Sequence, residues 1–584
     1  MRWLAIGTLS ALLLGATSYT ASAAWPALGR AIAIAANDQD HPRATTDGAG
    51  GAIITWQDDR SGAVHIFAQH VRFSSELDAA WPVNGRGLLT DPAALANALG
   101  GQTRPVITAD GAGGAIVVWQ DQRNESPGSD IFAQHVLSTG GVDPDWPANG
   151  QALCIAPGVQ DNAAIVSDGA GGAIVTWMDG RAGGSAGGSG VNVFAQHVLG
   201  NGVVDPNWPT NGRALSTAPL TQAFPKIVSD RSGGAIVTWS DFRPSATGVD
   251  IYAEHVLSNG VVDPAWPANG RALTTAPGTQ IDAVIASDGG HGAIVAWTDA
   301  RNGENHIFAQ RVLVTGAIAA GWPADGLAVS TAPIDQTTPA ITSDGGSGAI
   351  VTWQDLRNGE NHNPFVQHVL DSGSVDPAWP VNGRALSLSS GESTSNSIVG
   401  DGSGGAFVTW EEDSFVKSNH VLASGLLDPT FPVNGAFARL DLSFQERPDL
   451  VAGGGGNAIV AWANSLTGAE FDIFAQLVGA ESVLGVPGIT PPSAITFARP
   501  SPNPARGPLG LRFTLPEDAA VTLAILDVSG RRVRGLASGS LPAGEHVVNW
   551  DLRDADGRPV RSGVYFARLV VGEQAFTHKF VAAQ

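Results

Sequence analysis

The chain has 584 residues, including 74 glycines and one cysteine, and a formal net charge of −22. We expect no nucleic-acid partner, because affinity for phosphates comes from clustered Lys and Arg, and lysine occurs only at positions 226, 417 and 579. The composition also excludes collagen and coiled coils, and beyond the amino terminus no stretch reaches the roughly 18 apolar residues of a membrane-spanning helix.

The first 23 residues have the pattern of an export signal. Arg2 precedes an apolar stretch from Trp3 to Ala16, and small residues at 21–23 form a cleavage site. We expect this segment to be removed and the protein to be exported, to the extracellular space or the outer cell surface. The alternative is a retained anchor helix. Cys154 then has no intramolecular partner, and we interpret it as a small core residue rather than a reactive thiol.

An internal repeat accounts for most of the chain. The phrase Gly-Ala-Ile-Val-x-Trp and close variants occur eight times, with the tryptophans 52 to 63 residues apart. A second phrase, Trp-Pro-x-Asn-Gly-Arg-Ala-Leu, also occurs eight times in variant forms, from Trp25 to Phe431. Each repeat is therefore one structural unit.

One unit contains four strand candidates, which we take from the third copy. They are Ala164–Asp168, Ala173–Trp177, Val193–Val198 and Gly212–Ser216. These short segments are rich in β-branched and aromatic residues and are separated by Asp-Gly and Asn-Gly turns. Four strands repeated radially predict a β-propeller.

The two ends of the repeat region indicate how the ring closes. The last repeat ends without a Trp-Pro phrase, and that phrase opens the mature chain at Trp25. An amino-terminal strand would then complete the eighth blade and remove an exposed sheet edge. We predict an all-β protein with an eight-bladed propeller over residues 24–482, a Pro/Gly linker over 483–492 and a small Ig-like sandwich over 493–584. A seven-bladed or two-sheet arrangement is the alternative.

Repeated polar residues follow the second strand and lie within the third. Trp-x-Asp-x-Arg occurs in six copies, and we interpret each pair as a structural clasp in which Arg can stack on tryptophan. The alternative is an incomplete ring of guanidinium sites for glycan or carboxylate. Six third strands carry histidine, which we expect to bond between neighbouring blades, because side chains so far from the axis cannot converge on one metal ion. These histidines are His70, His135, His197, His255, His368 and His420.

Seven first strands end on an aspartate. If these strands are innermost, the carboxylates circle one mouth of the channel. They either cap their own Asp-Gly turns or attract a cation, with calcium as the candidate. No other cofactor or metal is expected. The ring consists of Asp47, Asp110, Asp168, Asp230, Asp288, Asp344 and Asp401.

The known catalytic patterns fit poorly. Sialidases share the propeller architecture, and residues 167–177 loosely resemble their Asp-box, but a sialidase-type site needs a tyrosine nucleophile. After the signal, tyrosine occurs only at Tyr252, at a repeated aromatic position, and at Tyr565, in the last domain. Gly-x-Ser-x-Gly occurs only in low-complexity stretches. Paired carboxylates for another glycosidase stay open, and residues 411–447, where the repeat degenerates, are where a unique site is expected.

The last 92 residues leave the repeat and predict an antiparallel sandwich. Its strand candidates are Leu509–Leu515, Ala520–Asp527, Gly544–Asp551, Gly563–Val571 and Ala575–Ala582. Ordered motifs run through this segment, and their most characteristic residues are Ser501, Pro502, Asn503, Pro504, Trp550, Asp551, Gly563 and Tyr565.

These motifs together resemble the C-terminal sorting domain of type IX secretion substrates and the Ig-like module of flagellar hook-capping proteins. The resemblance implies a signal that an outer-membrane translocon recognises, often followed by cleavage and surface attachment. The chain ends on Val581-Ala-Ala-Gln584, where that family usually ends on a basic residue. The alternative is a plain Ig-like adhesive module.

Near-identical repeats favour multivalent binding or a structural scaffold over catalysis, which needs a unique constellation of residues. We therefore expect a binding or scaffold propeller with a glycan or protein ligand. The alternative is a glycan-active hydrolase or lyase with an acidic site at one mouth.

Overall fold

The computed structural model divides the chain into two compact units, Met1–Gly485 and Val486–Gln584. In the first unit it describes residues 25–479, apart from 27, 90–100, 125–127, 182–189, 244–247, 360, 440–442 and 466–469. In the second it describes 495–583, apart from 501–502, 504, 506–508, 516–518, 542–543, 551, 555–557 and 573. The predicted export signal and linker lie outside these residues.

Eight antiparallel four-stranded sheets make up the described part of the first unit. The innermost strands are β2 (Gln39–Thr46), β6 (Gln102–Ala109), β10 (Gln160–Ser167), β14 (Gln222–Ser229), β18 (Gln280–Ser287), β22 (Gln336–Ser343), β26 (Ser393–Gly400) and β30 (Phe444–Ala452). The second strands are β3 (Ala52–Asp58), β7 (Ala115–Asp121), β11 (Ala173–Asp179), β15 (Ala235–Asp241), β19 (Ala293–Asp299), β23 (Ala349–Asp355), β27 (Ala406–Glu412) and β31 (Ala458–Ser465).

The third strands are β4 (His65–Val71), β8 (Asp130–Val136), β12 (Asn192–Val198), β16 (Asp250–Val256), β20 (His306–Val312), β24 (Asn363–Val369), β28 (Phe415–Val421) and β32 (Asp472–Val478). The fourth are β5 (Arg86–Gly87), β9 (Gln151–Cys154), β13 (Arg213–Ala214), β17 (Arg271–Ala272), β21 (Leu327–Ser330), β25 (Arg384–Ala385), β29 (Ala436–Phe437) and β1 (Arg30–Ala33). A short 3-10 turn, η1 (Gly454–Gly456), lies between β30 and β31.

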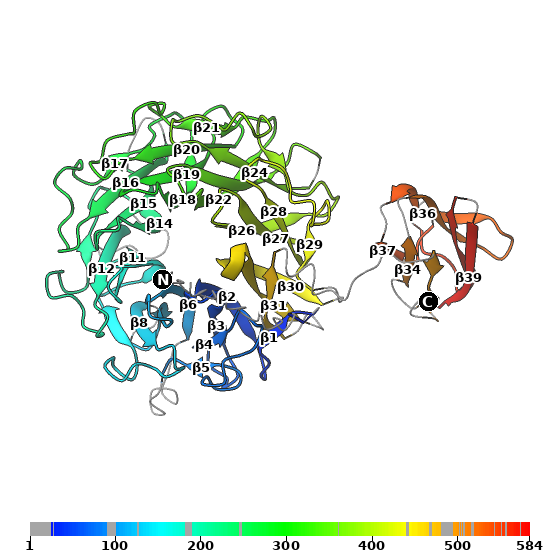
Figure 1. Ribbon diagram of the computed structural model, residues 1–584, viewed down its shortest axis with the longest axis horizontal. Coiled ribbons are helices and arrows are strands. Elements are labelled where there is room, and N and C mark those ends of the chain that lie inside the picture. The colour runs from blue at the N-terminus through cyan, green and yellow to red at the C-terminus, as the bar shows by residue number, and fades with distance from the viewer. Residues whose placement is uncertain are drawn as a thin grey trace, which may run out of the picture. The chain divides into compact units, whose positions relative to one another are not determined.

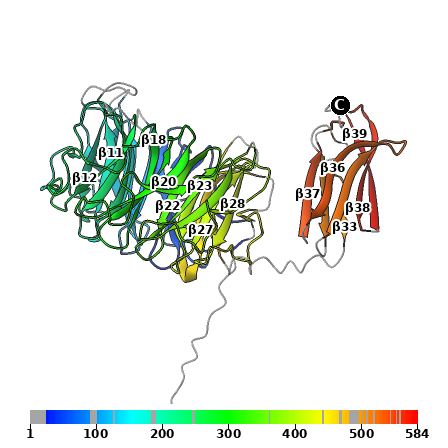
Figure 2. The same cartoon turned by 90° about the horizontal axis from the view of Figure 1, so that it is seen from above.

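The sheets stand around a ring (Figure 1). Each innermost strand contacts the innermost strand of the next sheet, and β30 contacts β2. The last sheet takes its fourth strand from the other end of the repeats, because β1 pairs antiparallel with β32, Arg30 opposite Ala475. Figure 2, at right angles to the first view, shows the strands running side by side across the thickness of the ring. The architecture of this unit is propeller-like.

The core lies between neighbouring sheets rather than in one place. Along β3, Ile54 and Trp56 pack on the last sheet, and Ile53 packs on the sheet of β6 to β9. Both faces of a second strand are therefore buried, which explains its continuous apolar sequence. Gly85 has a φ of 91°, and a Cβ there would lie 2.4 Å from the Trp56 ring, so this Asn-Gly turn needs its glycine.

Hydrogen bonds from the Trp-Pro phrase join neighbouring sheets at seven of the eight junctions, the exception being the phrase that begins with Phe431. The Trp81 indole N–H donates to the carbonyl of Ser138 in the following sheet, at 3.2 Å. Five further Trp-Pro tryptophans make the equivalent bond, and Trp25 makes it to Phe73. The expectation that the repeated histidines make these bonds between neighbours is wrong, as their contacts below show.

The second unit is an antiparallel sandwich. One sheet has the order β33-β34-β37, and the other has β36-β35-β38-β39. The strands are β33 (Thr496–Phe497), β34 (Leu509–Leu515), β35 (Ala519–Leu526), β36 (Arg532–Leu541), β37 (Gly544–Trp550), β38 (Gly563–Val571) and β39 (Gln574–Ala582). Residues from both sheets, including Phe513, Leu523 and Phe580, form one core. The sequence prediction missed β33 and β36.

Candidate binding site

A buried histidine joins two loops within each of six sheets. In the third repeat His197 bonds Asp168 through Nε2 at 3.0 Å and Asp205 through Nδ1 at 2.9 Å. Both aspartates belong to the same repeat as the histidine. Burial alone would lower the pKa of His197, but the bonds to the two carboxylates outweigh it and raise that pKa. The cluster therefore holds the turn after β10 and the loop after β12 together.

The aspartate of this cluster also caps its hairpin. Oδ1 of Asp168 accepts bonds from the backbone N–H groups of Ala170 at 2.7 Å and Gly172 at 2.9 Å, while Oδ2 faces the histidine. The other members of the predicted aspartate ring make the same pair of turn bonds. These are the contacts that the turn-capping alternative requires. Among the described residues, no group of three or more His, Cys, Asp or Glu side chains is arranged to hold a metal ion.

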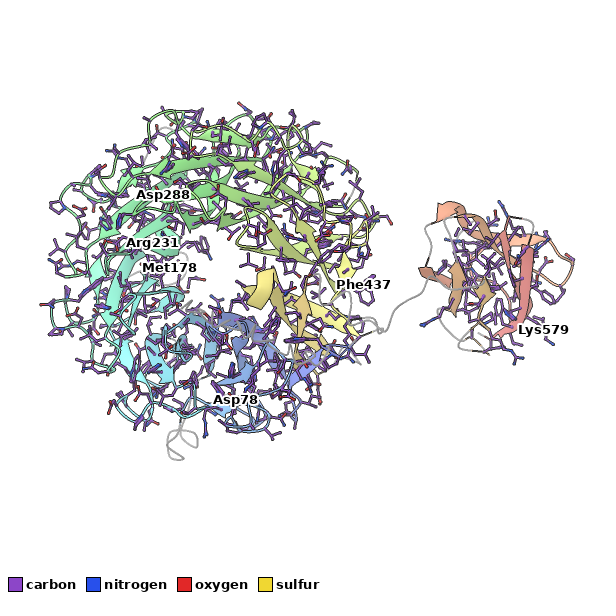
Figure 3. The ribbon with its side chains drawn as sticks, in the orientation of Figure 1. Asp78, Met178, Arg231, Asp288, Phe437 and Lys579 are labelled. Carbon is purple, nitrogen blue, oxygen red and sulfur yellow. The ribbon has the colours of Figure 1, made fainter. Side chains whose placement is uncertain are left out.

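The fifth repeat changes both partners of the cluster together. Arg311 replaces the histidine and bonds Asp288, labelled in Figure 3, at 3.0 Å. The second aspartate of the cluster is absent, since Ala319 occupies its place and donates its N–H to the Arg311 carbonyl. One cation then faces one carboxylate. This pair is neutral, whereas each sister cluster holds two carboxylates for one histidine.

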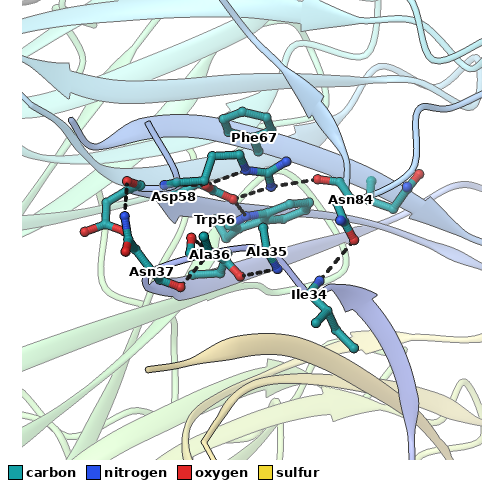
Figure 4. Close-up of polar contacts among 12 residues, drawn as sticks. Ile34, Ala35, Ala36, Asn37, Trp56, Asp58, Phe67 and Asn84 are labelled. Atoms are coloured by element: carbon teal, nitrogen blue, oxygen red, sulfur yellow. Dashed lines mark hydrogen bonds and ion pairs between the residues drawn. The ribbon is translucent and has the colours of Figure 1, made fainter. Parts of the chain in front are cut away.

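A second repeated cluster lies at the other end of each sheet (Figure 4). The Trp56 indole N–H donates to Asp58 at 2.8 Å, and Nε of Arg60 donates to the same carboxylate at 2.7 Å. The Arg60 guanidinium lies 4.1 Å from the centre of the Phe67 ring and donates to the carbonyl of Asn84 at 2.8 Å. The predicted clasp is present, but Arg stacks on the third-strand aromatic residue rather than on tryptophan.

The two degenerate repeats rebuild this clasp from other residues. In the seventh, Glu412 bonds Lys417, whose ammonium lies 4.8 Å from the Phe437 ring, so the cation has moved to the third strand and the aromatic ring to the fourth. In the eighth, the Arg439 guanidinium lies 4.5 Å from the Phe474 ring and donates to the carbonyl of Leu28. The loss of the repeated Asp and Arg at these positions therefore marks a structural replacement.

The innermost strands carry a different kind of feature near their starts. In each one the register with the second strand skips two residues, which is a β-bulge. One skipped residue in every strand is a non-glycine residue in the left-handed region, with φ between 48° and 57°. We call these residues the bulge ring: His41, Arg104, Asn162, Phe224, Asp282, Thr338, Ser395 and Arg447.

The bulge ring is costly for the backbone and does not repeat in sequence. Left-handed conformations cost L residues about 1–2 kcal/mol each, and such strain clusters at functional sites. Glycine would avoid that cost, yet no bulge-ring position carries it. Sequence reasoning missed these residues, although one signal was available: the position holds seven residue types in eight copies, while the residue two places before it is glutamine in seven of them.

A cavity of about 530 Å³ lies against one arc of the bulge ring. All its lining residues come from innermost strands, so it belongs to the central channel. Four are bulge-ring residues from β2, β6, β10 and β14, and the charged ones beside them are Arg43, Lys226 and Asp449. Asn162 donates to the sulfur of Met178, a residue on the inner side of the ring (Figure 3). A second cavity of about 290 Å³ follows the innermost strands from β10 to β26 and is lined mainly by apolar side chains.

Charged residues gather where β30 meets β2. Arg447 bonds Asp40 and lies 3.2 Å from Nδ1 of His41. Burial raises the pKa of Asp40, but the bonds from His41 and Arg447 outweigh it and lower that pKa to about 2. Burial and the charge of Glu446 raise the pKa of the nearby Glu411. Most of the cluster lies within the degenerate stretch where the sequence predicts a unique site.

Cys154 and the described motif residues of the second unit have structural contacts. Cys154 is buried in the core, as the sequence analysis expects, and burial raises its pKa to about 12. Asn503 accepts from the Val581 N–H at 3.0 Å, the Trp550 indole donates to Arg553, and the Tyr565 hydroxyl donates to Arg561. Gly563 pairs with Ala582. Ser501, Pro502, Pro504 and Asp551 lie outside the described residues.

Comparison with solved structures gives distant likenesses. Polysaccharide lyase Uly1 is 8% identical, with a TM-score of 0.38 over 76% of this chain and 99% of that one. A PL25 ulvan lyase is 10% identical, with a TM-score of 0.37 over 62% and 90%. The α-L-arabinanase of Penicillium chrysogenum is 14% identical, with a TM-score of 0.32 over 55% and 93%. Likeness at this level carries no argument about function.

No curated protein matches the chain. Among the described residues, no helix is both long and apolar enough to span a membrane. Residues 504–572 match the FlgD Ig-like domain, which agrees with the resemblance to hook-capping proteins found in the sequence.

Proposed function

We propose that the protein is an exported, eight-bladed β-propeller that binds a ligand in its central channel without transforming it. The observation that carries this proposal is the contrast between repeated and non-repeated polar side chains. Repeated groups such as His197 and Arg60 are used within their own sheets, whereas the bulge ring differs from strand to strand. A rigid repeated support with variable residues on its inner rim suits a binding site.

The eight-bladed count rests on the number of sheets and on their contacts. Eight sheets of one strand order are present in the described part, and their innermost strands contact each other around the ring. The pairing of β1 with β32 supports closure, since it removes the free edge of the last sheet. We take each sheet as one blade.

We further propose that the second unit directs the protein to the outer cell surface through a type IX-like translocon. The FlgD Ig-like match and the ordered motifs support this proposed location. Deleting residues 493–584 should leave the protein in the periplasm, measured by cell fractionation and by surface labelling of intact cells. Unchanged surface display of the truncated protein would refute the proposal.

A glycan-active hydrolase or lyase is the second candidate. The observation that favours it is the pair Glu411 and Glu446 beside Arg447 and His41, because burial and the negative charge of Glu446 raise the pKa of Glu411 toward the range of a general acid. Mature full-length protein should be screened on a glycan array and, in parallel, for degradation of acidic and neutral polysaccharides. Binding without release of reducing or unsaturated ends supports the binding protein. Release that a Glu411→Gln variant loses supports the enzyme.

A further inference from the structure

Three basic side chains line the larger channel cavity, in a chain where acidic residues outnumber basic ones by 54 to 32. They are Arg43, Arg104 and Lys226, and each of their side chains is exposed. Arg43 donates to the carbonyl of its neighbour Pro42, and Arg104 donates to the amide oxygen of Asn162. No carboxylate in the described part of the chain forms an ion pair with any of the three. Asp449, Asp161 and Asp282 interact with Arg43, Arg104 and Lys226 respectively through charge at longer range, so a ligand anion would have no direct ion pair to displace in the described part of the chain.

The arrangement of two of these cations is unfavourable without a ligand. Desolvation by the surrounding strands lowers the pKa of Lys226, and the charge of Arg43 lowers it further against a smaller opposing effect of Asp282. The one carboxylate that lines the same cavity, Asp449, accepts the N–H of Ala44 at 2.8 Å. Like charges that face the same cavity repel each other, and an anion between them would remove that repulsion.

The fold itself does not need these cations. Arg43 and Lys226 occupy the strand position directly after the bulge, where they pair with Thr55 and Thr238. In five other sheets the same position is filled by a small or apolar residue (Val106, Ala164, Val284, Ala340 or Ser397), and in the eighth it is filled by Asp449. Those sheets have the same register and the same bulge. The cations are therefore additions to the scaffold.

Phe224 gives the cavity an aromatic surface. Its side chain is 52% exposed, its φ is 56°, and it lines the cavity next to Lys226. A bulky residue in the left-handed region is a true conformational outlier, and an exposed one gains little from burial to offset the cost. An exposed aromatic ring that lines a cavity offers a surface on which a ligand ring can stack.

We propose that this cavity binds a small sugar-like ligand that carries a carboxylate, sulfate or phosphate group, with Arg43, Arg104 and Lys226 around the anion and Phe224 against the ring. The volume lies within the range of small-molecule sites, and Arg is suited to bidentate contact with such anions. This inference rests on the proposed binding function of the channel.

The experiment measures thermal stability and calorimetric binding of the mature full-length protein. Its probes share one sugar ring: glucuronate, glucose 6-sulfate, glucose 6-phosphate and neutral glucose, each at equal ionic strength. We expect at least one anionic sugar to raise the Tm and glucose to leave it unchanged, and the responding probe identifies the anion.

Lys226→Val introduces the residue that two other sheets have at this position, Val106 and Val284. Lys579→Val is the control, because it removes the same charge from an exposed position in β39. Lys226→Val should raise the Tm of the free protein and weaken anion binding by about tenfold or more, the loss of one charge-assisted bond. The control should bind like the native chain.

Three results would overturn the proposal: equal binding of glucose and the anionic sugars, unchanged binding by Lys226→Val, or no response to any probe. If the glycan array still shows a neutral ligand, the binding function stands and only the anion inference fails.

Discussion

Arg311 bonds the Asp288 carboxylate at 3.0 Å, in the place where six other sheets hold a histidine between two aspartates. The same sheet has Ala319 where the second aspartate would stand. The two positions have changed together, which leaves one positive group facing one negative group in place of one histidine between two aspartates. This coupling makes a quantitative prediction.

Arg311→His alone should lower stability, because a neutral or singly paired histidine replaces a full ion pair. Adding Ala319→Asp should recover part of the loss by completing the cluster of the other sheets. We expect a coupling free energy of about 0.5–3 kcal/mol between the two sites, as for residues in one network. Urea unfolding of the two single variants and the double variant measures it, and strictly additive effects would contradict the cluster.

The histidine clusters predict how stability depends on pH. The pKa values of His197 and His255 are raised above 6.5, since their aspartate bonds outweigh the opposing effect of burial. The stability that these two histidines contribute to the fold is complete below about pH 6.5 and is lost as the pH rises through their pKa values in the folded protein. The pKa of Asp168 is lowered below 3.8. The stability that this carboxylate contributes is therefore lost as the pH falls through its pKa in the folded protein.

The Tm should therefore be highest between about pH 4 and 6.5 and should decrease on both sides. Replacing His197 and His255 by Gln should flatten the decrease above pH 6.5. His578→Gln is the control, because His578 lies in β39 of the second unit and bonds the carbonyl of Phe497, away from the repeated clusters. A Tm that rises from pH 6.5 to 9 would contradict the assignment.

The rebuilt clasp of the seventh repeat predicts a large loss from one substitution. Lys417→Met leaves Glu412 buried without a cation, which costs about 3–5 kcal/mol when a buried pair is broken. Lys579→Met removes an exposed charge from the other unit and should change stability little. Chemical unfolding compares the two. Equal midpoints would show that the Glu412–Lys417 pair has no structural role.

The bulge ring predicts an unusual stabilising substitution. Phe224→Gly should raise the Tm, since glycine adopts a φ of 56° without the steric cost of a side chain. Phe224→Ala removes the same ring but keeps a Cβ, so it should remain less stable than the glycine variant. The difference between the two, measured by urea unfolding, should be about 1 kcal/mol. A glycine variant less stable than the alanine variant would show that the backbone at position 224 is not strained.

The sequence determines the local frame of this protein. The two repeated tryptophan phrases define the unit, and its β-branched and aromatic segments with the turns between them predict four strands, because strand preference and turn formation depend on a few neighbouring residues. The same pattern predicts that Trp25 opens the strand that completes the last sheet, and β1 pairs with β32. In the second unit, the bounds of β34 and β38 agree with the predicted ones.

Only the tertiary structure decided which side chains meet. The turn after the first strand and the loop after the third lie at the same end of an antiparallel sheet, but only the tertiary structure shows that the histidines bond across these two segments within their own sheet rather than to a neighbouring sheet. The bulge at Phe224 carries no turn residue, and Arg43 and Lys226 are 183 positions apart in the sequence. They share one cavity because the ring of sheets brings their strands to a common centre.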